Sequence, residues 1–251
     1  MDLVEKTSNA NRHPWELSRA ESILSVMAKD ISHSAKFVDI GAGDRFFTQK
    51  LGSIVKGDIY AVDSGYNENS MIDGIHCLTS VSDLPKIDEN SVDIMGRERS
   101  IVTILDVLEH TEDAVQFLQE IISKVPQNTT FFITVPAFQF LFSAHDTFLK
   151  HFRRYNKTAL LKVLKENNLK VKKYHYFYCS LFFARLFSRI IANKPKEQEG
   201  IGGWKFGEKH FITLLIKLIL NLDFKCCAFL ANLKIFIPGL SLLAVCERES
   251  N

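Results

Sequence analysis

The residues that point most clearly to chemistry are two aspartates and a glycine-rich turn near the start of the chain. Asp39 is followed by Gly41, Ala42 and Gly43, and Asp63 ends the next β-prone run. Glycines let the backbone turn tightly and approach a ligand without a Cβ in the way, and a helix after them presents unpaired N–H groups. A carboxylate about 20 residues further on can accept hydrogen bonds from both hydroxyls of a ribose. The spacing therefore predicts a nucleoside-binding site.

A dinucleotide cofactor is disfavoured by the residue three positions after Gly43. The dinucleotide fingerprint G-x-G-x-x-G needs glycine or alanine at position 46, where this chain has Phe46. None of the six tyrosines is followed four residues later by lysine, so the tyrosine and lysine pair of short-chain dehydrogenases is also absent. S-adenosylmethionine has no pyrophosphate and does not need the close helix approach that the third glycine gives. It fits this loop better.

Four segments support this interpretation: 38–43 (VDIGAG), 61–63 (AVD), 83–84 (DL) and 105–110 (LDVLEH). Together they resemble the class I S-adenosylmethionine-dependent methyltransferases, over about residues 12–180. The last segment is typical of the branch that contains quinone and small-molecule methyltransferases. Further segments resemble a largely uncharacterised subgroup of the family, and these are 12–16, 135–139, 143–146, 151–155 and 238–241. The resemblance implies S-adenosylmethionine as the cofactor and an enzyme that transfers its methyl group.

The resemblance also implies which part of the cofactor each residue contacts. Asp39 and the glycine loop would hold the methionine end, Asp63 the ribose, and Asp106 would stand near the sulfonium. Asp83 and the backbone of Leu84 would hold the adenine. The full set of expected cofactor-binding residues is Asp39, Gly41, Ala42, Gly43, Asp63, Ser64, Asp83, Leu84 and Asp106.

Two departures from the family pattern put cofactor affinity in question. The third glycine of the family's G-x-G-x-G is Arg45 here, and the charged segment Gly96–Ser100 looks like an insertion before the next strand. The leading hypothesis is a methyltransferase that acts on a small-molecule or lipid-linked acceptor, with oxygen as the expected methyl acceptor. The alternative is a degenerate methyltransferase fold with a cofactor-binding, regulatory or scaffold role.

Methyl transfer is an in-line displacement, so the enzyme aligns the reactants and, for a hydroxyl acceptor, removes a proton. His110 is the first candidate base because it follows Asp106 at the strand end and imidazole titrates near neutral pH. Glu109 and His145 complete the expected catalytic set. The alternative for His110 is a histidine that only ties loops together. The spacing of Asp106, Glu109 and His110 resembles the divalent-metal site of ubiquinone O-methyltransferases, but no metal is expected because Glu-His at this place is widespread in the family without one.

The loop after the strand at 130–135 is where this architecture places contacts to the acceptor. It contains His151, Arg153, Arg154 and Tyr155, which we expect to bind the substrate. Arginine can hold a carboxylate or phosphate in bidentate fashion. The alternative is that Arg153, Arg154 and Tyr155 pin the loop to the following helix.

The elements that must position these residues alternate between strands and helices. The pattern predicts an α/β, Rossmann-like fold, with a mostly parallel sheet and helices on both faces, and the family implies seven strands. A single domain over 1–251 is expected, with an N-terminal helix at 14–29. Trp15 and Glu16 of that helix are candidates to close over the cofactor, or to pack against a sheet edge. The expected strands are 36–40, 58–62, 101–105, 130–135, 169–178 and 240–245.

Residues 180–237 break the alternation and are expected to form a helical insertion within the domain. Its helices, rich in leucine, isoleucine and phenylalanine, either pack into the core or form an acceptor pocket or a surface that touches a membrane. The uncharged stretch 235–246 is too short for a bilayer, which needs roughly 20 residues. No transmembrane helix is therefore expected, and membrane contact would be peripheral.

Composition narrows the partners and the compartment. The formal net charge is +2 and no N/D-P-P-Y/F motif occurs at position 106, so nucleic acid is not an expected substrate. The five cysteines form no C-x-x-C pair, and the chain begins without an apolar signal segment. A cytoplasmic protein is expected. The oligomeric state is left open.

Overall fold

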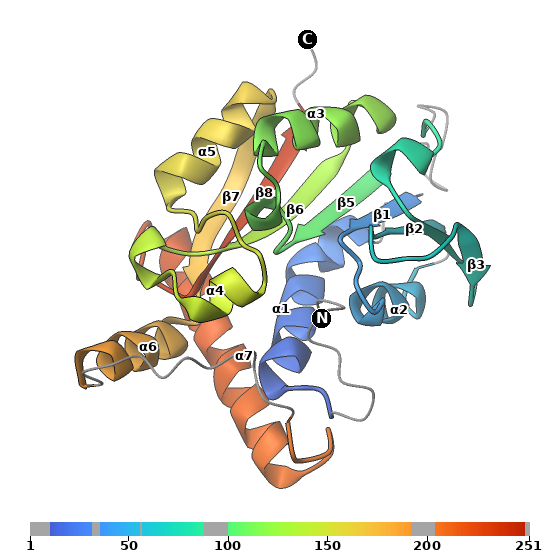
Figure 1. The fold of residues 1–251 in the computed structure, drawn as a ribbon. Coiled ribbons are helices and arrows are strands. Elements are labelled where there is room, and N and C mark those ends of the chain that lie inside the picture. The colour runs from blue at the N-terminus through green and yellow to red at the C-terminus, as the bar shows by residue number, and fades with distance from the viewer. Residues whose placement is uncertain (1–10, 32–35, 56, 88–99, 192–203, 249–251) are drawn as a thin grey trace.

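An eight-stranded sheet runs through the middle of the computed structural model (Figure 1). The structure describes residues 11–31, 36–55, 57–87, 100–191 and 204–248. The strand order is β3-β4-β2-β1-β5-β6-β8-β7. The strands are β1 (Lys36–Ile40), β2 (Asp58–Val62), β3 (Ser70–Ile72), β4 (Ile75–Leu78), β5 (Ser100–Leu105), β6 (Thr130–Pro136), β7 (Leu169–Phe177) and β8 (Ser241–Arg248).

The prediction of a mostly parallel sheet is confirmed, but the strand count of seven is wrong. Six strands run in one direction, and β3 and β8 run against them. The additional strand is β3, which has three residues, all of them exposed, and is too short to give a strand pattern in the sequence. Its hairpin with β4 turns at Asp73 and Gly74, both with positive φ, as a two-residue hairpin turn of this kind requires.

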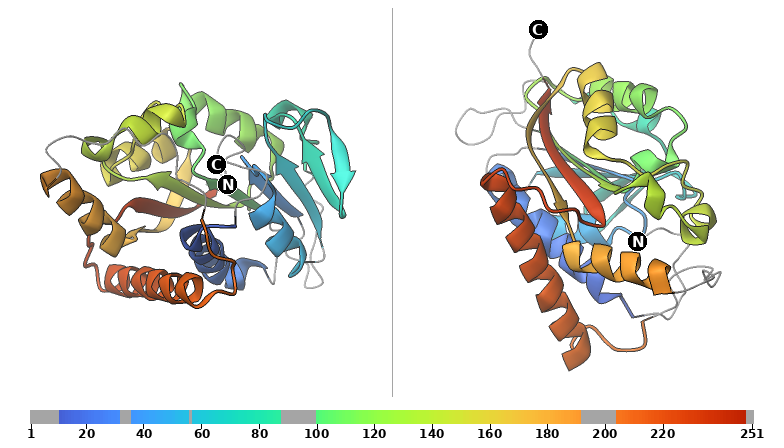
Figure 2. Two further views of the ribbon diagram at one scale, coloured as in Figure 1. Left: turned by 60° about the horizontal axis from the view of Figure 1, so that its bottom comes forward. Right: turned by 90° about the vertical axis from the view of Figure 1, so that its left-hand side faces the viewer.

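Helices cover both faces of the sheet, which explains why its central strands are almost continuously buried. On one face α3 and α5 pack over a core that includes Val102, Ile104 and Ile133. On the other face α1, α2 and α7 pack over Phe37 and Phe132, and both layers are visible in Figure 2. The α-helices are α1 (Pro14–Ile31), α2 (Phe46–Gly52), α3 (Ala114–Lys124), α4 (Ala144–Phe148), α5 (Lys157–Glu166), α6 (Cys179–Ile191) and α7 (Phe211–Asn232).

Two long helices, α6 and α7, lie between β7 and β8, in the segment expected to be a helical insertion. α7 packs against α1, where Lys217 Nζ and Asn221 Nδ2 bind the two carboxylate oxygens of Glu21 at 2.7 and 2.9 Å. Its inner side buries Leu220 and Phe224 against the sheet. None of the helices in the described ranges is long and apolar enough to cross a membrane.

Candidate active site

A cavity of about 2040 Å³ opens where the parallel strands end. The last residues of β1, β2 and β5 line it, as expected for an open α/β sheet. The start of α1 forms one wall, which includes Trp15 and Glu16, and α6 forms another. A cavity of this size exceeds the usual range of about 300–1,000 Å³ for one small ligand, so it has room for two ligands side by side.

The glycine loop after β1 approaches the end of β5 more closely than any other residue type would allow. Gly41 and Gly43 have φ values of 69° and 52°. A Cβ on Gly41 would lie 2.3 Å from Cγ2 of Val107. The backbone N–H groups of Gly41 and Ala42 donate to the carbonyl oxygen of Val62 at 2.8 and 3.1 Å, which ties the loop to β2. The loop is therefore a tight backbone wall of the cavity.

Arg45 keeps the loop geometry although glycine is absent there. Its φ is 64°, in the left-handed region that glycine favours. Its guanidinium extends to the Sγ of Cys77 at 3.5 Å, and it does not line the cavity. The departure from the family pattern therefore costs backbone strain of about 1–3 kcal/mol and leaves the loop shape unchanged. Of the expected insertion at 96–100, residues 96–99 lie outside the described residues, and Ser100 begins β5.

Asp63 connects the glycine loop to the turn after β2. One carboxylate oxygen accepts a hydrogen bond from the N–H of Gly43 at 2.7 Å, and the other accepts one from the N–H of Gly65 at 2.8 Å. Asp63 and Ser64 both line the cavity. Each carboxylate oxygen has a second lone pair, so the fixed carboxylate retains the capacity to accept hydrogen bonds from a diol.

Asp39 lies beneath the loop with its carboxylate bound by the protein. It is buried, and it accepts hydrogen bonds from the hydroxyls of Thr48 at 2.5 Å and Thr103 at 2.7 Å. Burial raises the pKa of Asp39 to about 6, against the lowering effect of these hydroxyls. Its side chain thus joins β1 to α2 and β5. This position favours a role in shaping the loop over direct contact with the cofactor.

Asp83 and Leu84 are expected to hold the adenine, but the residues that line the cavity here come slightly earlier in the chain. Asp83 is exposed, and its carboxylate accepts a hydrogen bond from the hydroxyl of Thr79 at 2.8 Å. The N–H of Leu84 donates to the carbonyl oxygen of Val81, so it is already engaged. Neither Asp83 nor Leu84 lines the cavity, whereas Thr79, Ser80 and Val81 do.

Asp106, at the end of β5, is held by an arginine that the sequence motifs do not identify. Arg19 of α1 forms an ion pair with Asp106 and donates to the Thr134 hydroxyl at 2.5 Å. Asp106 has a φ of 55°, a strained conformation typical of residues at functional sites. Arg19 lines the cavity with Glu16 and Ala20, at the three- and four-residue spacing of one helix face. The available signal in the sequence was the placement of Glu16 and Arg19 three residues apart on one face of the predicted helix.

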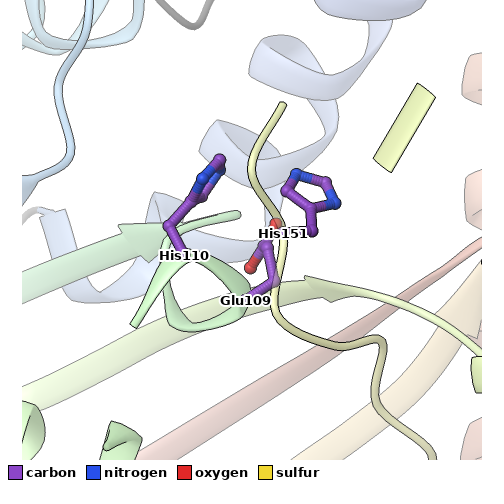
Figure 3. A group of neighbouring side chains, drawn as sticks. All are labelled: Glu109, His110 and His151. Carbon is purple, nitrogen blue, oxygen red and sulfur yellow. The ribbon is translucent and has the colours of Figure 1, made fainter. Parts of the chain in front are cut away.

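Glu109, His110 and His151 come together (Figure 3), and all three line the cavity. One possible ligand atom from each lies within 4.8 Å of the others, and the two imidazole rings meet edge to face at 4.6 Å. Glu109 is fully buried, and its carboxylate accepts no hydrogen bond from another described residue. Burial and the nearby Asp106 raise its pKa well above the usual value. The group could exchange a proton or bind a divalent cation.

His151 is oriented by a buried carboxylate. Its Nδ1 lies 3.0 Å from Oδ1 of Asp146, and Arg154 binds the two oxygens of the same carboxylate at 2.7 and 3.1 Å. Burial alone would raise the pKa of Asp146, but the hydrogen bonds from His151 and Arg154 hold it well below its usual range. His151, Arg154 and His145 all line the cavity. This network fixes the ring of His151 next to His110.

Arg153 and Tyr155, which were expected to bind substrate, instead hold the loop in place. Arg153 is half-buried and donates to the carbonyl oxygen of Glu112 at 2.6 Å. Tyr155 is buried, and its hydroxyl donates to the carbonyl oxygen of Leu108 at 3.1 Å. Neither residue lines the cavity. For these two residues the geometry is that of a pinning role, but the contacts reach Glu112 and Leu108 and not the following helix. His151 and Arg154 line the cavity.

Three comparisons relate this chain to known proteins. No protein-family model matches the sequence, and no curated protein sequence matches it. Solved structures do match. Geranyl diphosphate methyltransferase in complex with S-adenosylmethionine has a TM-score of 0.54 at 10% identity, over 92% of this chain and 85% of that one.

Two further structures share the fold. The 1,6-didemethyltoxoflavin-N1-methyltransferase of Burkholderia thailandensis, with bound 1,6-didemethyltoxoflavin and S-adenosylhomocysteine, has a TM-score of 0.52 at 11% identity, over 94% of this chain and 81% of that one. An S-adenosylmethionine-dependent methyltransferase of Mesorhizobium loti has a TM-score of 0.52 at 12% identity, over 92% of this chain and 98% of that one. At these identities the similarity shows a common fold.

Proposed function

We propose that this chain, which has the fold of the class I S-adenosylmethionine-dependent methyltransferases, is itself a methyltransferase that uses S-adenosylmethionine. The acceptor is a small molecule or a lipid-linked molecule, and oxygen is the atom methylated. The observation that carries the proposal is that the N–H of Gly43 holds the Asp63 carboxylate, which lines the cavity at the ends of the strands. Two of the comparison structures hold S-adenosylmethionine or S-adenosylhomocysteine, which supports the same cofactor here.

The residues of this half of the cavity fit a nucleoside cofactor. The wall next to Val107 is bare backbone, because a Cβ on Gly41 would meet that side chain. The loop lies beside the Asp63 carboxylate, which can accept hydrogen bonds from ribose hydroxyls. When bound, S-adenosylmethionine supplies an electrophilic methyl group on a sulfonium. The chain's task is then to align the acceptor with that methyl and to remove a proton.

His110 is the proposed general base for a hydroxyl acceptor. It lines the cavity beside His151, whose ring orientation Asp146 fixes. An imidazole that takes the hydroxyl proton lets the acceptor oxygen form its bond to the methyl carbon as the bond to sulfur breaks. Burial raises the pKa of Glu109 well above its usual value, which reduces its negative charge beside the reacting groups. His145, at the outer side of this end, is proposed to contact the acceptor.

A lipid-linked acceptor is favoured by the outer face of α7, which is apolar and exposed. Its exposed side chains repeat at helical spacing, as on a helix that lies on a membrane surface, and Lys225 and Lys234 are exposed nearby. We therefore propose peripheral membrane contact through the segment 180–237. The stripe consists of Phe211, Leu215, Leu218, Leu222 and Phe229.

Vesicle flotation tests the membrane contact. The wild-type chain should float with vesicles that contain phosphatidylglycerol, and the double variant Leu218→Glu with Leu222→Glu should remain at the bottom of the gradient. Ile54→Glu is the control because Ile54 is equally exposed but lies at the end of α2. Absence of wild-type flotation would remove the membrane proposal and leave the methyltransferase proposal intact.

Calorimetric binding of S-adenosylmethionine and S-adenosylhomocysteine tests the cofactor. The wild type should bind both with micromolar affinity, and Asp63→Ala should lose at least about tenfold through two lost hydrogen bonds to the ribose. Asp83→Ala is the matched control, because Asp83 is an exposed carboxylate outside the cavity. It should bind as the wild type does.

A folded wild-type chain that binds neither compound would overturn the proposal. The degenerate fold with a scaffold role would then be the better account, with the strained loop at Arg45 as the first place to examine. Circular dichroism establishes that each variant is folded. Loss of binding in Asp83→Ala as well would show that Asp83 contacts the adenine, as expected from the sequence.

A further inference from the structure

The acceptor end of the cavity holds more positive than negative charge. Arg154, Arg185 and Arg189 all line it. The carboxylate that pairs with Arg154 and faces Arg185 is Asp146. Arg154 is buried, Arg185 is partly buried and Arg189 is exposed. Guanidinium groups that are buried or partly buried are costly without counter-charge. An anion in the cavity would supply that charge.

Asp146 is too heavily engaged to neutralise a second arginine. Its carboxylate accepts hydrogen bonds from the N–H and hydroxyl of Ser143, at 2.9 and 3.0 Å, in addition to those from His151 and Arg154. The Nη2 of Arg185 is 3.8 Å from this carboxylate and donates to the Ser143 hydroxyl at 2.6 Å instead. Burial lowers the pKa of Arg185, and the charge of Arg154 lowers it further. Arg154 and Arg189 thus oppose the charge of Arg185, whereas Asp146 favours it.

The face of α6 toward the cavity is both apolar and cationic. Leu181, Ala184, Arg185 and Ser188 line the cavity at the three- and four-residue spacing of one helix face. Arg189 follows at the next position and donates to the carbonyl oxygens of Phe140 and Phe142. A ligand along this face would meet aliphatic side chains first and guanidinium groups further on. That arrangement matches an amphiphile with an anionic end.

We propose that this end of the cavity binds an anionic group of the acceptor, a phosphate or a carboxylate, between Arg185 and Arg189 of α6 and His145 of α4. Guanidinium groups present paired N–H donors to such oxygens, and the half-buried position strengthens the interaction relative to open water. The inference deepens the proposed function, on which it rests for the identity of the ligand as the acceptor. The charge of the site does not depend on that function.

The test uses the full chain and three probes in calorimetry: decyl phosphate below its micelle concentration, decanol, and inorganic phosphate. Decyl phosphate should bind the wild type, and Arg185→Gln should weaken it about tenfold or more, as expected for a charge-assisted contact. Arg185→Lys keeps the charge and should recover part of the affinity. Lys162→Gln removes an exposed charge on α5, outside the cavity, and should bind as the wild type does.

Equal binding of decanol and decyl phosphate, or unchanged affinity in Arg185→Gln, would overturn the anion site. If inorganic phosphate also binds, a free phosphate group is sufficient for binding. If only decyl phosphate binds, the site requires an amphiphile. Both outcomes support the site. If Arg185→Gln does not fold, Arg189→Gln gives the same comparison with an exposed residue. S-adenosylhomocysteine is titrated in parallel. If decyl phosphate binds and S-adenosylhomocysteine does not, the proposed function is rejected and the anion site stands. If S-adenosylhomocysteine binds and decyl phosphate does not, the anion site is rejected and the proposed function stands.

Discussion

Arg19 of α1 is ion-paired with Asp106 at the end of β5, across 87 positions of sequence. The Thr134 hydroxyl on β6 joins them, since it accepts from Arg19 and donates to Asp106 at 3.0 Å. One side chain from the N-terminal helix thus cancels the negative charge at the position proposed for the sulfonium. The N-terminal helix therefore helps to set the electrostatics of the site, in addition to forming its wall.

Removal of Arg19 should change which form of the cofactor is preferred. Arg19→Met leaves the negative charge of Asp106 without its partner. That charge attracts the positive sulfonium of S-adenosylmethionine, whereas S-adenosylhomocysteine has no such charge. We expect the ratio of their affinities to shift toward S-adenosylmethionine by about fivefold or more, a modest Coulomb effect at partial burial. Calorimetry with both compounds gives the ratio. Arg153→Met, outside the cavity, should leave it unchanged, and an unchanged ratio in Arg19→Met would contradict the place assigned to the sulfonium.

Gly41 and Gly74 provide a matched pair for testing the close approach of the loop. Both have positive φ, 69° and 76°, but a Cβ on Gly74 meets nothing within 4 Å, whereas one on Gly41 meets Val107. Gly74→Ala should cost about 1 kcal/mol of unfolding free energy from backbone strain alone. Gly41→Ala should cost more and should weaken S-adenosylhomocysteine about tenfold. Denaturant unfolding and calorimetry measure the two effects. Equal behaviour of the two variants would show that the contact with Val107 relaxes freely.

Added Zn²⁺ should bind at Glu109, His110 and His151. A carboxylate and two imidazoles within 4.8 Å suit zinc, and the other ring nitrogen of His151 is oriented by Asp146, as is usual for histidines that bind metals. We expect the affinity to fall about tenfold or more in His151→Ala, with His76→Ala, on β4 and outside the cavity, as the control. Titration of metal-free protein measures it. Methyl transfer itself is expected to survive treatment with a chelator, because the proposed reaction needs no metal.

His175 of β7 is a core histidine outside the site. It is buried against Phe224, and neither ring nitrogen has a hydrogen-bond partner within the described ranges. Burial lowers its pKa to about 4, with a further contribution from Lys173. The folded state therefore requires the neutral ring. The unfolded chain binds the proton more readily at mildly acidic pH.

This difference predicts a specific loss of stability in acid. The folded pKa of His175 is below the unfolded value of 6.5, so its contribution is complete above pH 6.5 and is lost as pH falls toward 4. The loss amounts to roughly 3 kcal/mol by pH 4. His175→Leu should flatten this part of the stability profile, while His76→Leu should keep it. Denaturant unfolding between pH 4 and 8 decides the matter, and an unaltered slope in His175→Leu would contradict the assignment.

The alternation of strands and helices along the chain and the position of the cofactor loop were accessible from the sequence because both depend on local patterns. Alternation of apolar runs with helical periodicity indicates a parallel sheet, and Gly41 and Gly43 mark the turn after β1. The short exposed strand β3 was missed because three residues are too few to give a strand pattern. Its Asp73-Gly74 turn was the local signal.

The roles of individual side chains were decided by tertiary contacts that no spacing encodes. Arg153, Arg154 and Tyr155 are consecutive, yet only Arg154 faces the cavity. Which of them does so depends on where these residues meet Asp146, Leu108 and Glu112. The sequence by itself determined the fold class and the type of ligand the loop suits. Only the tertiary structure brought Arg19 to Asp106 and set Arg185 beside the acceptor space, because helices far apart in sequence must pack before their charges can meet.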